Sequence, residues 1–447
     1  MDRRMLLQGL AAGGLAAGVC GGAAAQPSGQ LTAGPASYRR LAAELDDNLR
    51  RQVVGKWFPR ALDTERGGFH QNYAEDWSFI PRGDRGVVYQ SRLTWLSAMA
   101  ARQYAQERRA WAGYSDHGLA FLANHLWDAE HGGFYWGLEA EAPFRPERDG
   151  EKHVYGHAFG IYATATNYHA THNPRALELA RRAFAWLDEK AHDPVHGGYH
   201  ESLDRQGRPI LAATADRPRD ALGTVAGQKS MNTHIHVLEA LTALYEVWPD
   251  AKLRVRLEEV FAIVRDKVAT PEGYLQLFFQ RDWTPVPRVV SFGHDVETGF
   301  LLVEASTVLG RPDDARTWAV ARKLVDRPLA HGWDERHGGF YDEGDYAGKL
   351  TRTHKVWWVQ AEGLNALILM HEKYGAETPR YWNAFVRQWA FIRDHQVDPR
   401  HGGWLSRVEP DGEMTPGLVK SDRWTEGYHQ GRALIRVGDT LRRLGGG

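Results

Sequence analysis

A glycine-rich turn recurs along this chain at a nearly constant interval. Five clear copies and one weaker copy are present, namely RGGFH at 66, HGGFYW at 131, HGGYHE at 196, TPEGYL at 270, RHGGFY at 336 and HGGWLS at 401. Their first glycines are separated by 65, 65, 76, 65 and 64 residues. A fixed interval of this length indicates repeated supersecondary units that bury their apolar faces against one another.

Each interval predicts two helices, because it contains about two stretches with apolar residues at three- and four-residue spacing. Asn173 and Asp250 are natural N-caps, and Pro174 suits a first helical position. The polar segment from Leu203 to Ala226 explains the one long interval as an inserted loop. The predicted helices span 36–58, 84–106, 110–127, 153–172, 174–192, 226–247, 250–268, 291–309, 312–330, 354–374, 378–396 and 424–443.

The first of these helices decides the topology. Segment 36–58 comes before the first glycine turn, just as the second helix of every pair comes before a glycine turn. It therefore pairs with helix 424–443, which has no other partner. We therefore predict an all-α fold, an (α/α)6 barrel of twelve helices in six helical hairpins, with an open superhelical array as the alternative. The glycine turns are predicted to be tight reversals with positive φ that link each outer helix to the next inner one. We interpret the turn histidines as structural, namely His131, His196, His337 and His401.

The N-terminal segment predicts export. Arg3 and Arg4 precede a Gly/Ala-rich apolar stretch that ends in three alanines at 23–25, the pattern of a Tat-type signal with its cleavage site. We expect residues 1–25 to be removed and residues 26–447 to form a single catalytic domain in the periplasm. Cys20 is the only cysteine, so the mature chain is expected to contain no disulfide, no thiolate nucleophile and no cysteine-based metal site.

Composition limits the partners of the chain. A sequence of 447 residues with 43% hydrophobic content and a net charge of -1 predicts a globular protein with a large core. It has no basic excess that would bind nucleic acid or an anionic membrane surface. The 17 tryptophans and 17 tyrosines suit either a large helical core or a sugar-binding cleft. Nothing in the sequence defines a subunit interface, so the expectation is a monomer or a homodimer.

Polar and aromatic residues gather at the starts of the predicted inner helices. In a closed ring these early turns surround one mouth, so residues far apart in the sequence converge. The candidate site residues are Arg92, Tyr155, Asn232, His236, His294, Glu297, Trp357, Trp358, Trp424 and His429.

The spacing of these residues constrains their chemistry. His294 and Glu297 are three residues apart and share a helix face, so the carboxylate could orient the imidazole or share a ligand with it. His234 and His236 diverge on a helix, and the chain lacks HExxH and cysteine pairs, so no metal is expected. It also lacks GxSxG, a phosphate loop and a dinucleotide fingerprint, so no cofactor is expected. A histidine acid/base site with an arginine and aromatic platforms remains.

Four stretches resemble a known family. MNTHIHVLEALTALYEVWPD, SFGHDVETGFLL, KVWWVQAEGLNAL and WTEGYHQGRA are similar to the N-acylglucosamine 2-epimerase superfamily, and most to its cellobiose 2-epimerase branch. The resemblance extends from about residue 40 to residue 443. It implies an (α/α)6 barrel and cofactor-independent inversion of C2 in a reducing-end sugar of the cellobiose or mannobiose type, through a cis-enediolate.

The resemblance also implies residue roles. His294 and His429 match the proton-transfer pair, and His236 matches a residue that assists ring opening. The positions that match sugar-holding or histidine-tuning residues are Arg92, Tyr155, Asn232, Glu297, Trp357 and Trp424. The chemistry of the residues agrees, because histidine titrates near neutrality, an arginine can stabilise an oxyanion at O1, and tryptophans stack on sugar faces.

Departures from the family pattern leave the substrate open. Thr298-Gly299-Phe300, Thr425 and Gln430 differ from residues common in the cellobiose branch and lie near the predicted pocket. Within the family, an N-acylglucosamine 2-epimerase or a mannose isomerase or epimerase acting on a monosaccharide is the alternative.

Two more distant classes also remain. An inverting glycoside hydrolase needs two carboxyl groups about 6.5–9.5 Å apart, for which Asp295 or Glu426 could join Glu297. A periplasmic sugar-binding protein explains the tryptophans but not three converging histidines.

Overall fold

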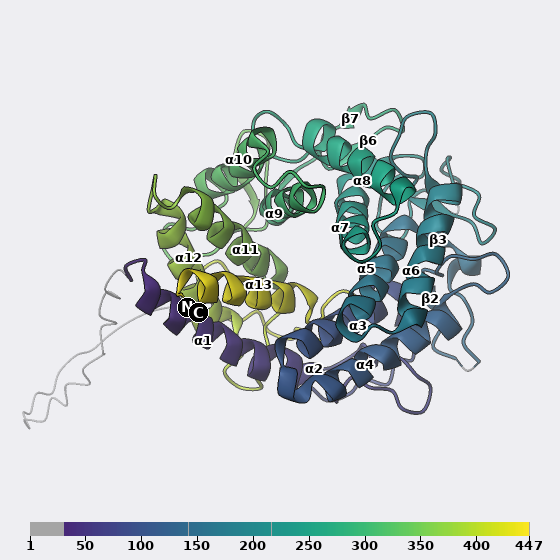
Figure 1. Cartoon of the computed structure of the whole chain (residues 1–447), viewed down its shortest axis with the longest axis horizontal. Helices are drawn as coiled ribbons and strands as arrows, with labels where there is room; N and C mark the ends of the chain where they lie inside the picture. Colours follow the sequence, from purple (N-terminus) through teal and green to yellow (C-terminus); the bar gives the residue numbers. More distant parts are fainter. Residues whose placement is uncertain (1–30, 142, 216, 447) are drawn as a thin grey trace, which may run out of the picture.

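The computed structural model describes residues 31–141, 143–215 and 217–446, which fold into a ring of paired helices (Figure 1). The predicted export segment 1–25 lies outside the described residues. Within the described ranges, no helix is long and apolar enough to cross a membrane. The α-helices are α1 (Pro35–Asn48), α2 (Gly55–Trp57), α3 (Val87–Gln103), α4 (Arg108–Phe121), α5 (Val154–Thr171), α6 (Pro174–Trp186), α7 (Met231–Val247), α8 (Ala251–Ile263), α9 (Phe292–Val308), α10 (Ala315–His331), α11 (Trp357–Tyr374), α12 (Arg380–Phe391) and α13 (Tyr428–Leu444).

Two concentric layers of helices form the ring. The inner helices α3, α5, α7, α9, α11 and α13 each pack against the next, and α13 packs against α3, which closes the circle. The outer helices α4, α6, α8, α10 and α12 each pack against the preceding inner helix. Helix α1 packs beside α13, so the first and last helices complete the sixth pair (Figure 1). The predicted (α/α)6 barrel is confirmed, and the open array is wrong.

The caps were predicted better than the helix boundaries. Asn173 accepts a hydrogen bond from the N–H of Arg175, and Asp250 accepts from Lys252 and Leu253, as expected. Helix α7 begins at Met231 rather than at 226, because an extended residue precedes it, and α13 begins at Tyr428 rather than at 424, because bends precede it. Most outer helices end in a wide π-helical turn, at Leu49–Val54, Leu122–Leu126, Leu187–Ala191, Val264–Val268 and Ile392–Gln396.

Short strands, which the sequence did not reveal, join neighbouring repeats. The strand before an inner helix pairs antiparallel with the strand that follows the next glycine turn, as β3 pairs with β4. At two or three residues each they are too short to produce an alternating pattern. They are β1 (Arg85–Gly86), β2 (Gly137–Leu138), β3 (Lys152–His153), β4 (Ser202–Leu203), β5 (Lys229–Ser230), β6 (Phe278–Phe279), β7 (Pro285–Val286), β8 (Val290–Ser291), β9 (Glu343–Gly344), β10 (Leu350–Arg352), β11 (Lys355–Val356) and β12 (Arg407–Val408).

The repeated turn requires glycine at both positions. Gly197 and Gly198 have φ values of 75° and 70°, in the left-handed region that side chains disfavour. A Cβ atom on Gly198 would lie 2.6 Å from the Trp283 ring. The positive φ predicted for these turns is confirmed, because every Gly-Gly pair of the five clear copies shares it.

A buried ion pair holds each of the five clear turns. Asp193 accepts hydrogen bonds from the backbone N–H groups of Val195 and His196 through Oδ1. Its Oδ2 accepts from Lys229 Nζ at 3.0 Å, and Lys229 also donates to the Gly197 carbonyl at 2.6 Å. The equivalent pairs are Arg85 with Asp63, Lys152 with Asp128, Lys355 with Asp334 and Lys420 with Asp398.

The inner helices add a second contact to the turns. In the fourth position of α5, His157 accepts the N–H of Phe134, and in α7, His234 accepts that of Tyr199. The same position is filled by Gln90, Asp295 and Gln360, which accept from Phe69, Leu275 and Phe340. Both contacts fix the starts of the inner helices, and it is these starts that carry the candidate site residues.

Candidate active site

The ten predicted site residues line one cavity of about 390 Å³. Nine of them lie in the first turns of inner helices, whereas Trp424 lies in the segment before α13. Asp422 Oδ1 holds that segment by accepting the N–H groups of Trp424 and Thr425 at 2.8 Å. Two further lining residues, Ala221 and Leu222, come from the inserted loop and were missed because an apolar pair in a loop carries no chemical signal.

His429 is held by a buried carboxylate. Its Nδ1 lies 2.7 Å from Glu362 Oε1, and both side chains are buried. When Glu362 is ionised, it accepts a hydrogen bond from the Nδ1–H group of His429, which leaves Nε2 as the unprotonated nitrogen. Burial, followed by the charges of Arg92 and Arg432, lowers the pKa of His429 well below its ordinary value. Sequence reasoning missed Glu362, although a glutamate inside the apolar run of KVWWVQAEGLNAL was a usable signal.

His294 has a different partner from the one expected. Its Nδ1 lies 2.8 Å from Ser291 Oγ, one turn earlier, and its ring packs against Trp358 at 4.7 Å. Of the two roles expected for Glu297, orienting this imidazole is wrong, because Glu297 is bound instead by the guanidinium of Arg432. Sharing a ligand with the imidazole stays a prediction. Burial, with a smaller contribution from the charge of His236, lowers the pKa of His294 to about 3.

Arg432 lies among three buried glutamates. Its guanidinium contacts Glu239, Glu297 and Glu362, the last at 2.7 Å. Burial raises the pKa of both Glu297 and Glu362, against the opposing charge of Arg432. One cation for three carboxylates therefore disfavours full ionisation of the group.

The same network reaches the third histidine. His236 Nδ1 lies 2.9 Å from Oε2 of Glu239, the glutamate that also contacts Arg432. Burial acts to raise the pKa of Glu239, but the Arg432 charge and the His236 hydrogen bond hold it below its ordinary value. Glu239 thus stays ionised and fixes the ring of His236.

Arg92 provides a fixed positive charge on the cavity wall. It donates to Glu426 Oε1 at 2.7 Å and to the Tyr155 hydroxyl at 3.1 Å, and it lies over the Phe159 ring. Burial raises the pKa of Tyr155 to about 12, so this hydroxyl is neutral near pH 7. The rigid guanidinium is suited to stabilising negative charge on a substrate oxygen.

The carboxylate pair of a glycoside hydrolase is not formed in the described part of the chain. Asp295 accepts the N–H of Leu275 and does not line the cavity. Glu426 is paired with Arg92 and also lies outside the cavity lining. Glu297 is the one carboxylate among the described lining residues, so the second carboxyl group that an inverting glycoside hydrolase needs is missing from this lining.

Three side chains beside the cavity lie as close together as the ligands of a metal ion, but their two carboxylates are already paired with an arginine. Glu297, Glu362 and His429 each have a potential ligand atom within 4.8 Å of the others. However, the guanidinium of Arg432 already contacts both carboxylates, and His429 Nδ1 lies within hydrogen-bond distance of Glu362. The positive charge among these groups is therefore that of Arg432.

Comparisons with known proteins agree with this geometry. A family model described as N-acylglucosamine 2-epimerase matches residues 67–431. The chain is 31% identical over 402 residues to a cellobiose 2-epimerase of Bacteroides fragilis, covering 89% of this chain and 98% of the relative. It is 27% identical to a D-mannose isomerase of Thermobifida fusca, covering 87% and 91%. The solved structure of cellobiose 2-epimerase from Spirochaeta thermophila matches with a TM-score of 0.80 and 29% identity, covering 91% and 98%.

Proposed function

Because the chain belongs to the N-acylglucosamine 2-epimerase family, we propose that it is a carbohydrate epimerase that inverts C2 of a reducing-end sugar. The similarity to cellobiose 2-epimerases over nearly the full length favours a disaccharide of the cellobiose type as substrate. The observation that carries the proposal is the placement of two imidazoles, on α9 and α13, in one cavity with a buried arginine.

The reaction needs only proton transfer. One histidine removes the proton from C2 of the open-chain aldose, and the resulting enediolate is planar at C2. The other histidine, in its protonated form, delivers a proton to the opposite face, so one C–H bond breaks and one forms. Burial lowers the pKa of both His294 and His429, which favours the neutral form that removes the C2 proton.

The remaining residues prepare the substrate for this transfer. Arg92 stabilises the negative charge that develops at O1, and His236, fixed by Glu239, assists opening of the sugar ring. Tyr155 and Asn232 bind hydroxyl groups. Stacking platforms are supplied by Trp357, Trp358 and Trp424.

Isotope exchange tests the proposal. The mature protein is incubated in deuterated water with cellobiose, mannose or N-acetylglucosamine, and the products are analysed by NMR. We expect deuterium at C2 of cellobiose and accumulation of its C2 epimer. Absence of C2 exchange in all three sugars would refute an epimerase.

A D-mannose isomerase is the second candidate, since the chain is similar to one over most of its length. Isomerisation differs only in returning the proton to C1 rather than C2. Formation of fructose from mannose, without a C2 epimer of cellobiose, would favour this candidate over the first.

We further propose that the enzyme acts in the periplasm. The support is the twin arginine at positions 3 and 4 and the alanine-rich cleavage pattern that ends at residue 25. An exported enzyme would meet its sugar before uptake into the cytoplasm.

A further inference from the structure

The inserted loop contributes part of the cavity wall. It connects β4 to β5, and its Arg219 and Val225 pair as the two sides of a tight turn. Asp220 Oδ1 accepts the N–H groups of Leu222 at 2.9 Å and Thr224 at 2.8 Å, which holds the tip of the turn. Leu222, together with its neighbour Ala221, lines the cavity beside the candidate catalytic residues.

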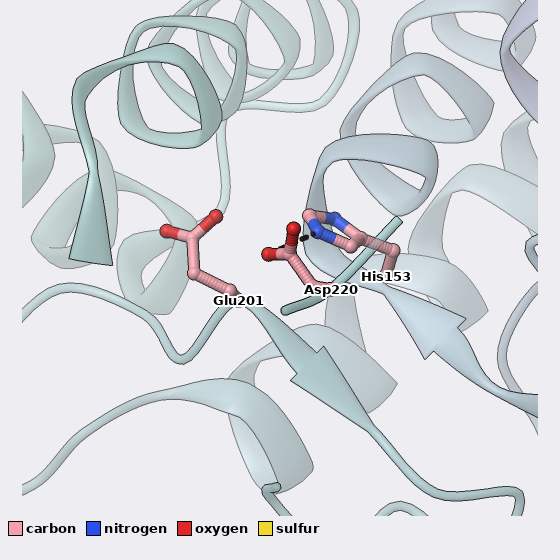
Figure 2. A group of neighbouring side chains, drawn as sticks. All are labelled: His153, Glu201 and Asp220. Atoms are coloured by element: carbon pink, nitrogen blue, oxygen red, sulfur yellow. Dashed lines mark hydrogen bonds and ion pairs between the residues drawn. The ribbon is translucent and has the colours of Figure 1, made fainter. Parts of the chain in front are cut away.

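The second oxygen of Asp220 connects this loop to the barrel. Asp220 Oδ2 lies 3.0 Å from His153 Nε2, and the two side chains have exposed fractions of 2% and 0% (Figure 2). His153 immediately precedes α5 and caps it, because its Nδ1 accepts the N–H of Tyr155 at 3.1 Å. One imidazole thus connects the loop to the helix start that carries Tyr155.

The capping contact fixes the proton on His153. A backbone N–H can only donate, so Nδ1 must offer its lone pair, and the neutral ring carries its proton on Nε2. That proton is directed at Asp220, which makes the contact a charge-assisted hydrogen bond. A metal ion would require the lone pair on Nε2 and a proton on Nδ1 facing the N–H of Tyr155.

Glu201 lies in the same cluster, yet it is committed to another helix (Figure 2). Its Oε1 accepts the N–H of Ser230, and its Oε2 accepts the hydroxyl groups of Ser230 and Thr233 at the start of α7. Glu201 is therefore bound at the start of α7, while His153 and Asp220 are bonded to each other. All three are engaged in structural hydrogen bonds, although they lie close enough together to bind a metal ion.

We propose that His153 and Asp220 are positioning residues, which hold Leu222 as a fixed apolar wall of the sugar-binding cavity. The inference rests on the proposed function. His153 also packs against Trp136 at 5.2 Å, and Trp136 packs against Trp424 at 5.9 Å. Trp424 lines the cavity and is 37% exposed. The His153 imidazole therefore supports two parts of the cavity wall, Leu222 through Asp220 and Trp424 through Trp136.

The variant Asp220→Asn separates the two functions of this carboxylate. Its amide oxygen can still accept the N–H groups of Leu222 and Thr224, but its NH2 group would face the N–H of His153. We expect KM for cellobiose to rise about 10-fold with kcat changed less than about twofold, because the wall binds ground and transition states alike. The amides of residues 217–225 should exchange with deuterated solvent at least about 10-fold faster.

Two further variants test the pairing. His153→Asn retains an N-cap but is too short to reach Asp220, so it should reproduce the Asp220→Asn phenotype. The double variant should be no worse than either single variant, since both remove one contact. Asp204→Asn, in the exposed turn at the other end of the same loop, is the matched control and should behave as wild type.

The two readouts separate failure of this inference from failure of the proposed function. Unchanged exchange of residues 217–225 in Asp220→Asn would overturn the positioning role, whatever the activity. Faster exchange with an unchanged KM would overturn the role in substrate binding. Zinc binding by the wild type that is lost in Asp220→Asn would also overturn it, because the assigned His153 tautomer excludes coordination. If the wild-type protein shows no C2 exchange, the proposed epimerase function is contradicted. The hydrogen exchange of residues 217–225 then still tests the positioning role of Asp220.

Discussion

Nδ1 of His429 lies 2.7 Å from Oε1 of Glu362, and both side chains are buried. His294, the other proposed proton-transfer residue, has a serine hydroxyl in the equivalent place. The two imidazoles are therefore unequal, because a carboxylate stabilises the imidazolium of one and a neutral hydroxyl contacts the other. The proton-transfer step should be more sensitive to the partner of His429 than to that of His294.

Glu362→Gln tests the carboxylate. The amide oxygen of glutamine can still accept the hydrogen bond from Nδ1–H, but the substitution removes the negative charge that favours the imidazolium. A neutral hydrogen bond is weaker than a charge-assisted one by about 1.4 kcal/mol, so kcat should fall roughly 10-fold. Glu372→Gln, on the same helix but in a surface pair with Arg443, is the matched control and should leave kcat unchanged. Equal rates for both variants would contradict a role for Glu362.

Removal of a turn lysine should be strongly destabilising. Lys355 Nζ donates to Asp334 Oδ2 and to the Gly338 carbonyl, both at 2.7 Å, and is fully buried. Lys355→Met leaves the Asp334 carboxylate without its cation, which costs about 3–5 kcal/mol. Urea denaturation should show this loss in the free energy of unfolding.

The matched control for this change is Lys373→Met, which removes a surface ion pair with Asp313. Exposed pairs contribute about 0–1 kcal/mol, so this variant should unfold near the wild-type midpoint. An equal loss of unfolding free energy in both lysine variants would show that the buried turn pair stabilises the fold no more than a surface pair does.

The barrel could be predicted from the sequence because its signals repeat. Glycine turns at a constant interval gave the number of hairpins, and segment 36–58 gave the closure. The site residues could be placed because equivalent helix starts must share one mouth. The pairing of residues distant in the sequence, such as Glu362 with His429 and Arg432 with Glu297, could not be deduced, since it depends on how side chains pack inside the ring. The apolar loop tip at Leu222 was missed because an apolar pair in a loop carries no chemical signal.

Buried histidines should make the fold sensitive to mild acid. Burial lowers the pKa of His157 to about 3, whereas the unfolded chain has an ordinary value near 6.5. Between those values the unfolded state binds the extra proton, so stability is full above about pH 6.5 and falls as the pH decreases. His234 and His294 have the same lowered pKa, and each contributes on the order of 1 kcal/mol per pH unit in this window.

His157→Gln checks this account, because Gln90 and Gln360 fill the same position in other repeats and accept the same turn N–H. Thermal unfolding should depend less on pH between 6.5 and 4 in the variant. His354→Gln, at a partly exposed side chain, serves as control. Identical slopes for wild type and His157→Gln would show that this histidine is not responsible.

Export predicts a defined mature N-terminus. Because Arg3 and Arg4 precede an apolar stretch that ends in alanines 23–25, we expect cleavage near Ala25. N-terminal sequencing of periplasmic protein should begin within a few residues of Gln26. Replacement of both arginines by lysine should retain the protein in the cytoplasm, and a full-length cytoplasmic product of the natural sequence would contradict the expectation.

The two proton-transfer histidines should be distinguishable from the turn histidines by rate and by isotope exchange. Loss of a general acid or base typically costs about 10²–10⁴-fold in rate, so His294→Ala and His429→Ala should each lose at least that much epimerase activity while remaining folded. The matched control is His337→Ala, whose imidazole lies 3.1 Å from Asp334 in a glycine turn. It should lower stability with little effect on turnover.

Isotope exchange then tells which histidine faces which side of C2. If the two bases act on opposite faces, each catalytic variant can still exchange the C2 proton of one epimer with deuterated solvent. The surviving epimer should differ between His294→Ala and His429→Ala, and neither variant should interconvert the pair. Unchanged turnover in either variant, or an inactive His337→Ala protein of normal stability, would require a different assignment of the proton-transfer residues.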